Sequence, residues 1–224
     1  MKRCTNEKIA GDVFAGDRVP IEVILIDADG VIQYAPEDWS CAFARCLSSE
    51  DPAQARKFTA DIYAAETACL SQVGGFDEAL HDVLRTWDRM AQKPLVLEAM
   101  MSIRKHHEVL QLISAIRAGG TRCYVASNQQ TQRAEFMSAE LGYASMFDGE
   151  FYSCNLGAAK PSERYFELAL KAAGADAGST LFIDDRPENV AGARRAGLHS
   201  FVYDGRSGVA VLESRLRDFG ITAA

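Results

Sequence analysis

The stretch EVILIDADGVI, residues 22–32, decides the fold class of this chain. Its apolar run VILID, Val23 to Asp27, has the pattern of a central parallel strand that is covered on both faces. The run ends in two carboxylates, Asp27 and Asp29, and Gly30 follows at once. Carboxylates that leave a buried strand are costly to desolvate unless something pairs with them. The stretch therefore predicts a metal site, a cationic ligand or a catalytic site.

Similar apolar runs recur along the chain, and segments with helical periodicity separate them. The predicted strands are CYVAS (123–127), TLFID (180–184) and SFVY (200–203). The predicted helices span 108–120, 162–174 and 187–197, each with glycine at its end. Strands that alternate with helices of this length predict a doubly wound parallel sheet in a three-layer α/β/α arrangement.

Residues 34–105 interrupt this alternation, because their apolar positions fall at helical spacing with no convincing strand. One helix is expected around Trp39 and Phe43, a second around Phe58 and Ile62, and a third after the N-cap candidate Asp77. The sequence thus predicts an inserted helical domain at 34–105, an α/β core at 21–33 and 106–224, and an N-terminal extension at 1–20.

Composition excludes several classes of protein. The 224 residues are 48% hydrophobic and 25% charged, and the net charge of -7 with scattered Lys and Arg argues against a nucleic-acid surface. The first twenty residues lack a signal-peptide core, and no apolar run is long enough to span a membrane. The six cysteines form no CxxC pair. We therefore expect a cytoplasmic protein with reduced thiols and no nucleic-acid or membrane partner.

The polar residues at the strand ends predict one shared site. Ligands of open α/β sheets bind beyond the carboxyl ends of the strands. Those ends carry, in chain order, Asp27 and Asp29, Ser127 and Asn128, and Asp184 and Asp185. Lys160 lies in GAAKPSERYF, directly before a helix that should pack beside these strands.

Four motifs in order, DADGV, ASN, KPSERYFELAL and FIDDRPENVAGARRAG, carry a family resemblance. The chain resembles the haloacid dehalogenase-like hydrolase superfamily, in the phosphatase and phosphoglucomutase-like branch with a helical cap inserted after the first motif. The resemblance covers about Glu22 to Tyr203. It implies a Rossmann-like core, with the segment 34–105 as the cap.

The resemblance also implies roles for the strand-end residues. Asp27 would be the nucleophile that forms an aspartyl-phosphate, and Asp29 the general acid and then base, protonated enough to serve the leaving oxygen. Ser127 and Asn128 would bind the phosphate. Lys160 would contact both the nucleophile and the phosphate as a point charge.

Magnesium is the implied cofactor, since it prefers hard oxygen ligands. By resemblance, Asp27 and Asp185 would give carboxylate oxygens and Asp29 its backbone carbonyl, while Asp184 would act directly or through a water. Asn189 would either brace this loop or lie on a helix surface.

An aspartate at position 29 suits protonation of an alkoxide, and dehalogenating members of the superfamily lack one there. The expected activity is therefore a magnesium-dependent phosphatase for small phosphorylated metabolites, with sugar phosphates as one possibility. A phosphomutase and a non-catalytic phospho-metabolite binding protein stay open as alternatives. A phosphonate hydrolase would need a cap lysine, for which Lys57 and Lys93 are present. The chain is expected to be a monomer or a homodimer.

Overall fold

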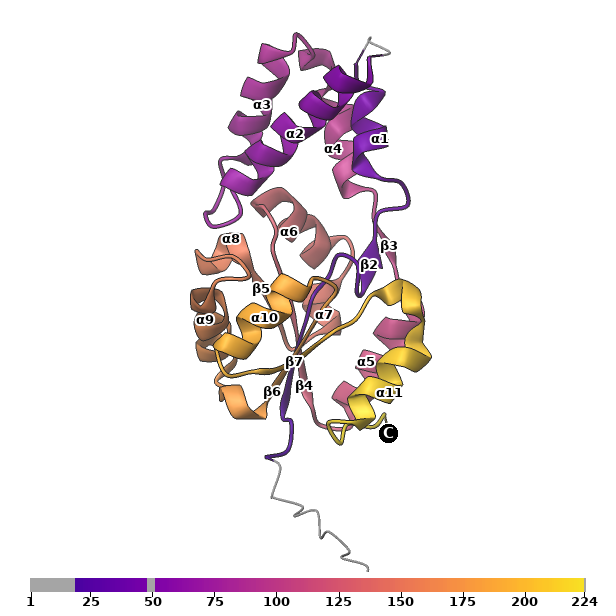
Figure 1. Ribbon diagram of the computed structural model, residues 1–224, viewed down its shortest axis with the longest axis vertical. Coiled ribbons are helices and arrows are strands. Elements are labelled where there is room, and N and C mark those ends of the chain that lie inside the picture. Colours follow the sequence, from indigo (N-terminus) through magenta and orange to yellow (C-terminus); the bar gives the residue numbers. More distant parts are fainter. Residues whose placement is uncertain (1–18, 48–50, 224) are drawn as a thin grey trace, which may run out of the picture.

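A central parallel sheet organises the computed structural model, which describes residues 19–47 and 51–223 (Figure 1). Within those residues the sheet has five strands in the order β5-β4-β1-β6-β7. They are β1 (Val23–Ile26), β4 (Arg122–Ser127), β5 (Gly149–Tyr152), β6 (Thr180–Asp184) and β7 (His199–Val202). In the centre, Ile26 pairs in register with Val125 of β4 and Ile183 of β6. The residues that follow these strands therefore emerge side by side at one edge.

Helices cover both faces of the sheet (Figure 1). On one face lie α5 (His107–Ala118) and α11 (Val209–Arg217), and on the other α9 (Glu163–Ala173) and α10 (Pro187–Arg195). Ile24 and Ile26 belong to the apolar cluster on the first face, and Val23 and Leu25 to the cluster on the second. Strand β1 is thus buried on both sides, and the three-layer α/β/α fold expected from the sequence is confirmed.

The edge strand β5 was not predicted from the sequence. Its sequence, GEFY, starts with a glycine and a glutamate, so it lacks the continuous apolar run of the central strands. It forms because β4 offers a free edge, with Ser127 pairing with Tyr152. The remaining core elements are α6 (Thr131–Ala139), α7 (Tyr143–Met146), α8 (Ser153–Leu156), and the 3-10 helices η2 (Ala177–Ser179) and η3 (Gly205–Ser207).

A separate group of helices, here called the helical unit, stands over the carboxyl edge of the sheet (Figure 1). It comprises α1 (Trp39–Ala44), α2 (Pro52–Ala68), α3 (Phe76–Thr86), η1 (Met90–Gln92) and α4 (Lys93–Met101). The unit has its own apolar core, in which Phe58, Leu80 and Met100 are fully buried. An antiparallel ribbon of β2 (Gln33–Tyr34) and β3 (Arg104–Lys105) joins it to the sheet.

The start of α3 differs from the sequence prediction. Gly75, at φ 84°, precedes the helix in the N-cap position, and Asp77 lies inside the first turn. Asp77 as the N-cap is therefore wrong. The helix dipole also favours an acidic side chain within the first turn, so an aspartate near a helix start does not by itself identify the N-cap.

Several expectations concern the N-terminal extension, the cysteines and membrane-spanning segments. The extension expected at 1–20 lies outside the described residues up to position 18. Cys41, Cys46, Cys69, Cys123 and Cys154 are free thiols. Within 19–47 and 51–223, no helix combines the length and the apolar character needed to cross a bilayer.

Candidate active site

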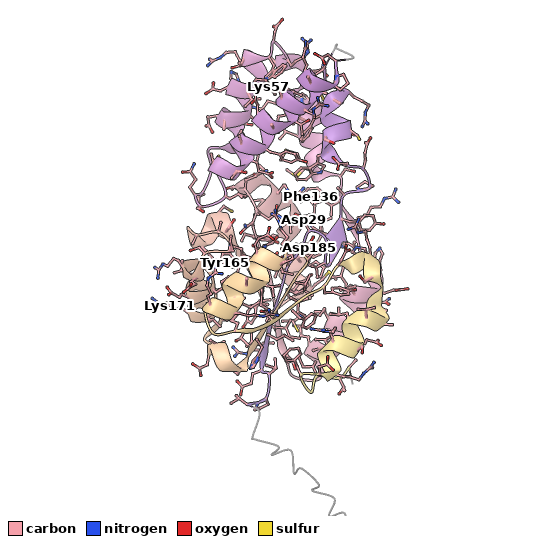
Figure 2. All side chains as sticks on the ribbon, in the orientation of Figure 1. Asp29, Lys57, Phe136, Tyr165, Lys171 and Asp185 are labelled. Atoms are coloured by element: carbon pink, nitrogen blue, oxygen red, sulfur yellow. The ribbon has the colours of Figure 1, made fainter. Side chains whose placement is uncertain are left out.

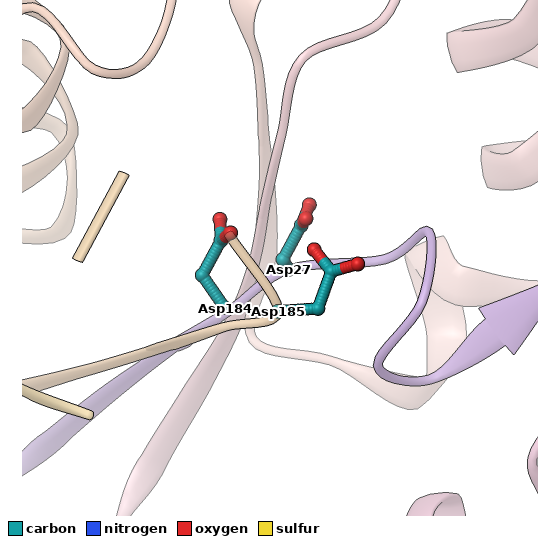
Figure 3. Close-up of side chains that lie close together, drawn as sticks. All are labelled: Asp27, Asp184 and Asp185. Carbon is teal, nitrogen blue, oxygen red and sulfur yellow. The ribbon is translucent and has the colours of Figure 1, made fainter. Parts of the chain in front are cut away.

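Three carboxylates converge where β1 and β6 end. Asp27 directly follows β1, Asp184 closes β6, and Asp185 is the next residue. One oxygen from each lies within 4.8 Å of the others. Figure 3 shows the three side chains around one shared space. They meet because β1 and β6 are parallel neighbours in register.

Lys160 is the cation of this group. Its Nζ lies 2.9 Å from Asp27 Oδ1 and 2.6 Å from Asp184 Oδ2, and it donates to the carbonyl of Ala126 at 2.8 Å. Burial acts to lower the pKa of Lys160, but the two carboxylates outweigh it, so the pKa is raised and the ammonium stays charged.

The three carboxylates carry more negative charge than Lys160 can balance. Burial, with the nearby charge of Asp184, raises the pKa of Asp27 to about 7 against the opposing effect of Lys160. Burial and Asp184 likewise raise the pKa of Asp185 to about 6. A divalent cation would relieve this repulsion, and carboxylate oxygens are the ligands that Mg²⁺ prefers. The residues therefore fit the magnesium expected from the sequence.

Asp184 and Asp185 differ in how they are held. The oxygens of Asp184 accept hydrogen bonds from the Arg186 backbone N–H at 2.8 Å and from Asn189 Nδ2 at 3.1 Å, besides the contact with Lys160. Asn189 is itself buried, so of its two expected roles the structure supports bracing of this loop. Asp184 is thus committed to protein donors, whereas the half-buried Asp185 has the freer carboxylate.

Gly30 is needed for the position of Asp185. Its backbone has φ +82°, which disfavours any residue with a side chain. A Cβ at this position would lie 2.3 Å from Asp185 Oδ2. The glycine after the two aspartates therefore makes room for the third carboxylate.

Ser127 is the last residue of β4 and Asn128 follows it, beside this group. The buried Ser127 hydroxyl accepts a hydrogen bond from Gln129 Nε2 at 3.2 Å. Asn128 uses its side chain on the backbone of Lys160, donating to the carbonyl and accepting from the N–H, both at 2.9 Å. Asn128 thus positions Lys160, and contact of either residue with phosphate stays a prediction.

Asp29 lies apart from the three converging carboxylates and faces other donors. Both of its oxygens are 2.9 Å from Arg133 Nη2, and Gln129 and Gln33 donate to them at 2.6 and 2.9 Å. Partial burial opposes ionisation, but Arg133 and the two glutamines outweigh it and lower the pKa of Asp29. These partners favour the carboxylate form of Asp29, and its protonation for the leaving oxygen stays a prediction. Coordination through its backbone carbonyl stays a prediction.

Sequence reasoning missed Arg133 and Gln129, although both lie in the segment SNQQTQR, which begins at the last residue of β4. The polar residues of this segment could have indicated a role in the site, because they begin at a strand end that was already assigned to it. Gln33, from the ribbon, carried no comparable signal because it sits among apolar and turn residues.

A cleft of about 920 Å³ opens between this site and the helical unit. Asp29 and Asp185, labelled in Figure 2, lie between the unit and the sheet. The floor of the cleft includes Asp29, Gly30, Asn128 and Asp185, and its roof includes Trp39, Tyr63, Glu66 and Leu70. A divalent cation bound by the carboxylates would let a small anionic ligand lie on this floor with its remainder against the roof.

The two lysines considered for a Schiff base are engaged elsewhere. Lys57 pairs with Asp61 at 2.8 Å, and Lys93 pairs with Asp77 at the same distance. Figure 2 shows Lys57 on the helical unit, well away from Asp29. Neither lysine lines the cleft, so a phosphonate hydrolase of that type finds no support.

Comparison with known proteins identifies the class. The family model of the haloacid dehalogenase-like hydrolases matches residues 21–197. The chain therefore belongs to the haloacid dehalogenase-like hydrolase family, as its motifs predicted. The structure of a HAD family enzyme of Bacteroides thetaiotaomicron in complex with magnesium and inorganic phosphate is similar to this chain, with a TM-score of 0.69. It is 19% identical and covers 86% of this chain and 98% of its own, a likeness that shows the fold.

Two curated fungal proteins match part of the chain. The drimenol cyclase of Aspergillus calidoustus is 28% identical over 109 residues, which is 49% of this chain and 21% of that protein. The sesquiterpene phosphatase of Aspergillus oryzae is 29% identical over 97 residues, which is 43% of this chain and 49% of that protein. The chain thus spans half or less of the length of these relatives.

Proposed function

We propose that this protein is a magnesium-dependent phosphatase that cleaves small organic phosphate monoesters. The observation that carries the proposal is the environment of Asp27. Its Oδ1 is held by the Ala28 N–H at 2.7 Å and by Lys160 at 2.9 Å, so that Oδ2 can serve as the nucleophile. A carboxylate oriented in this way beside a cation site suits attack on a phosphorus atom.

The reaction would proceed in two displacements. Asp27 Oδ2 attacks phosphorus, the P–O bond to the alcohol breaks, and Asp29 gives a proton to the departing oxygen. A water then attacks the aspartyl-phosphate, Asp29 accepts its proton, and the P–O bond to Asp27 breaks to release phosphate. The ionised Asp29 described above is the form that the second step requires. An entering phosphate dianion would favour the protonated form needed for the first.

Charge compensation comes from several groups. Lys160 would face the phosphoryl oxygens as well as Asp27, and the Ser127 hydroxyl would donate to one of them. Asp27 and Asp185 would hold the magnesium, with Asp184 behind them. The bound ion would supply compensation for the negative charge that develops on the phosphoryl oxygens.

The helical unit would act as a cap that excludes water and contacts the leaving group. Trp39 and Tyr63 stack in its roof with ring centroids 6.0 Å apart, and Leu70 lies beside them. An apolar or ring-faced leaving group fits this wall. Sugar phosphates can present such a face, and the sesquiterpene phosphatase relative supports hydrocarbon alcohol phosphates as a second group of candidates.

Phosphate release from a panel of sugar, nucleotide, prenyl and short-chain phosphate esters tests the proposal. We expect magnesium-dependent release by the wild type and a loss of at least about 10³-fold in Asp27→Asn, with the exposed Asp82→Asn as the matched control. Equal hydrolysis by wild type and Asp27→Asn would refute it. An isomerised sugar phosphate without free phosphate would identify a mutase, and tight binding without turnover a binding protein.

A further inference from the structure

We infer that Arg133 is a positioning residue that couples the helical unit to Asp29, and this inference rests on the phosphatase activity proposed above. Arg133 belongs to α6 of the sheet domain and is 1% exposed. Its Nη2 contacts both oxygens of Asp29 at 2.9 Å, and its Nε donates to Gln129 Oε1 at 2.8 Å. The guanidinium therefore fixes the orientation of the Asp29 carboxylate.

The same guanidinium also contacts residues of the helical unit. Its Nη1 donates to the carbonyl of Met100, in α4. Its Cζ lies 4.6 Å from the ring centroid of Trp39, the first residue of α1. Glu66 of α2 interacts electrostatically with it as well. One side chain thus joins Asp29 to α1 and α4 of the unit, and its charge also acts on Glu66 of α2.

These contacts make the orientation of Asp29 depend on where the helical unit sits. Arg133 is long and planar, and all five of its N–H groups point in directions fixed by the plane. If the unit moves relative to the sheet, the Met100 carbonyl and the Trp39 ring move with it. Arg133 would then lose partners on one side and its hold on Asp29 would change. The contact thereby ensures that Asp29 is aligned with the leaving oxygen when the unit covers the cleft.

Leaving-group dependence separates this role from a merely structural one. Protonation of the departing oxygen matters for an alkyl phosphate, whose alkoxide is a poor leaving group. It matters little for 4-nitrophenyl phosphate, because 4-nitrophenolate leaves without a proton. A residue that positions the proton donor must therefore affect the two esters unequally, whereas a general loss of structure affects both alike.

The experiment compares kcat and KM for propyl phosphate and 4-nitrophenyl phosphate in wild type, Arg133→Lys and Arg133→Gln, with the exposed Arg164→Lys as the matched control. We expect kcat for propyl phosphate to fall by about 10²-fold in Arg133→Gln, with a change below about 3-fold for 4-nitrophenyl phosphate. Arg133→Lys should keep part of the rate, because it retains the charge without the planar fork. Equal losses for both esters, or no loss, would overturn the inference.

Two further variants keep the test decisive if Arg133→Gln fails to fold. In an Asp29→Asn background, Arg133→Lys should cause no additional loss with propyl phosphate, since both act through one group. If the losses in kcat caused by the two single variants multiply in the double variant, the two residues act independently, and the inference is contradicted.

On the side of the helical unit, Trp39→Leu should shift the ratio of the kcat values for the two esters in the same direction as Arg133→Lys. An unchanged ratio would show that the unit does not act through Arg133. Absence of Asp27-dependent turnover in the wild type would instead refute the proposed phosphatase.

Discussion

Lys160 and Asp184 form a buried ion pair, with Nζ 2.6 Å from Oδ2 and side-chain exposures of 1% and 0%. The same ammonium also contacts Asp27 at 2.9 Å. Lys160 is therefore the counter-charge for two buried carboxylates from neighbouring strands. Lys160 therefore contributes to the stability of this end of the sheet as well as to the proposed chemistry.

Removing this cation should destabilise the fold. We expect Lys160→Met to lower the free energy of unfolding by about 3–5 kcal/mol, because Asp27 and Asp184 are left buried without a counter-charge. Urea denaturation measures the change, and magnesium should restore part of it. Lys171→Met, at an exposed position on α9 (Figure 2), should change stability by less than about 0.5 kcal/mol. Equal effects at the two lysines would contradict the role of Lys160.

Asp184 and Asp185 should respond differently to amidation. Asp185→Asn should weaken magnesium binding by about 10-fold or more while leaving the metal-free fold as stable or slightly more stable, because one of the repelling charges is gone. Asp184→Asn should destabilise the metal-free fold by about 1–3 kcal/mol, because a buried acceptor of the Lys160, Asn189 and Arg186 donors is lost.

Calorimetric titration with magnesium and thermal unfolding without it would measure both effects. The exposed Glu188→Gln, close by on α10, is the control. The assignment of the freer ligand to Asp185 fails if Asp184→Asn weakens magnesium binding with no cost to the metal-free fold while Asp185→Asn leaves binding intact.

Gly30→Ala should lower both stability and magnesium affinity more than the same substitution at a glycine outside the site. The new Cβ meets Asp185 Oδ2 at 2.3 Å and the backbone is held at φ +82°, so we expect about 2–4 kcal/mol of destabilisation and weaker magnesium binding. Gly174→Ala is the matched control, since its φ is +57° and nothing lies within 4 Å of its Cβ. That change should cost about 1 kcal/mol. Magnesium affinity equal in the two variants would show that Gly30 does not make room for Asp185.

Glu66 should make stability depend on pH. Burial, with a smaller contribution from the charge of Asp29, raises its pKa from 4.5 to about 7 against the effect of Arg133. Between these two values the folded state binds more protons than the unfolded state, so the free energy of unfolding falls as pH rises from about 4.5 to 7. The stabilisation is fully present below the lower value and is lost above the higher one.

Glu66→Gln replaces the ionisable carboxyl group with a neutral amide, so this position no longer contributes to the pH dependence of stability. At pH 8 the variant should be more stable than wild type by about 1–2 kcal/mol, a figure reduced from the full shift because the side chain is partly exposed, and at pH 4 the difference should vanish. Urea unfolding at both pH values measures it. The exposed Glu167→Gln should stay within about 0.5 kcal/mol of wild type throughout. Parallel stability curves for wild type and Glu66→Gln would rule out the effect.

The sequence by itself determined the sheet and the convergence of its polar ends. The runs at 23–27, 123–127 and 180–184 are apolar on both faces, which predicts central parallel strands. Parallel neighbours bring their carboxyl ends together, so the sequence predicts that Asp27, Asp184 and Asp185 meet, as they do in the structure. The amphipathic helices followed from the same reasoning, because their apolar stripes have the period of a helix.

Only the tertiary structure decided how Asp29 is held and which surface faces it. Its partners come from the ribbon, from the turn after β4 and from α6, and no local period relates these positions. The edge strand β5 also depends on its neighbour more than on its own residues. Periodicity reports which face of an element is buried, whereas contacts between distant side chains depend on how the elements pack. For that reason the sequence revealed the carboxylates of this site, and the fold revealed the arginine that links one of them to the helical unit.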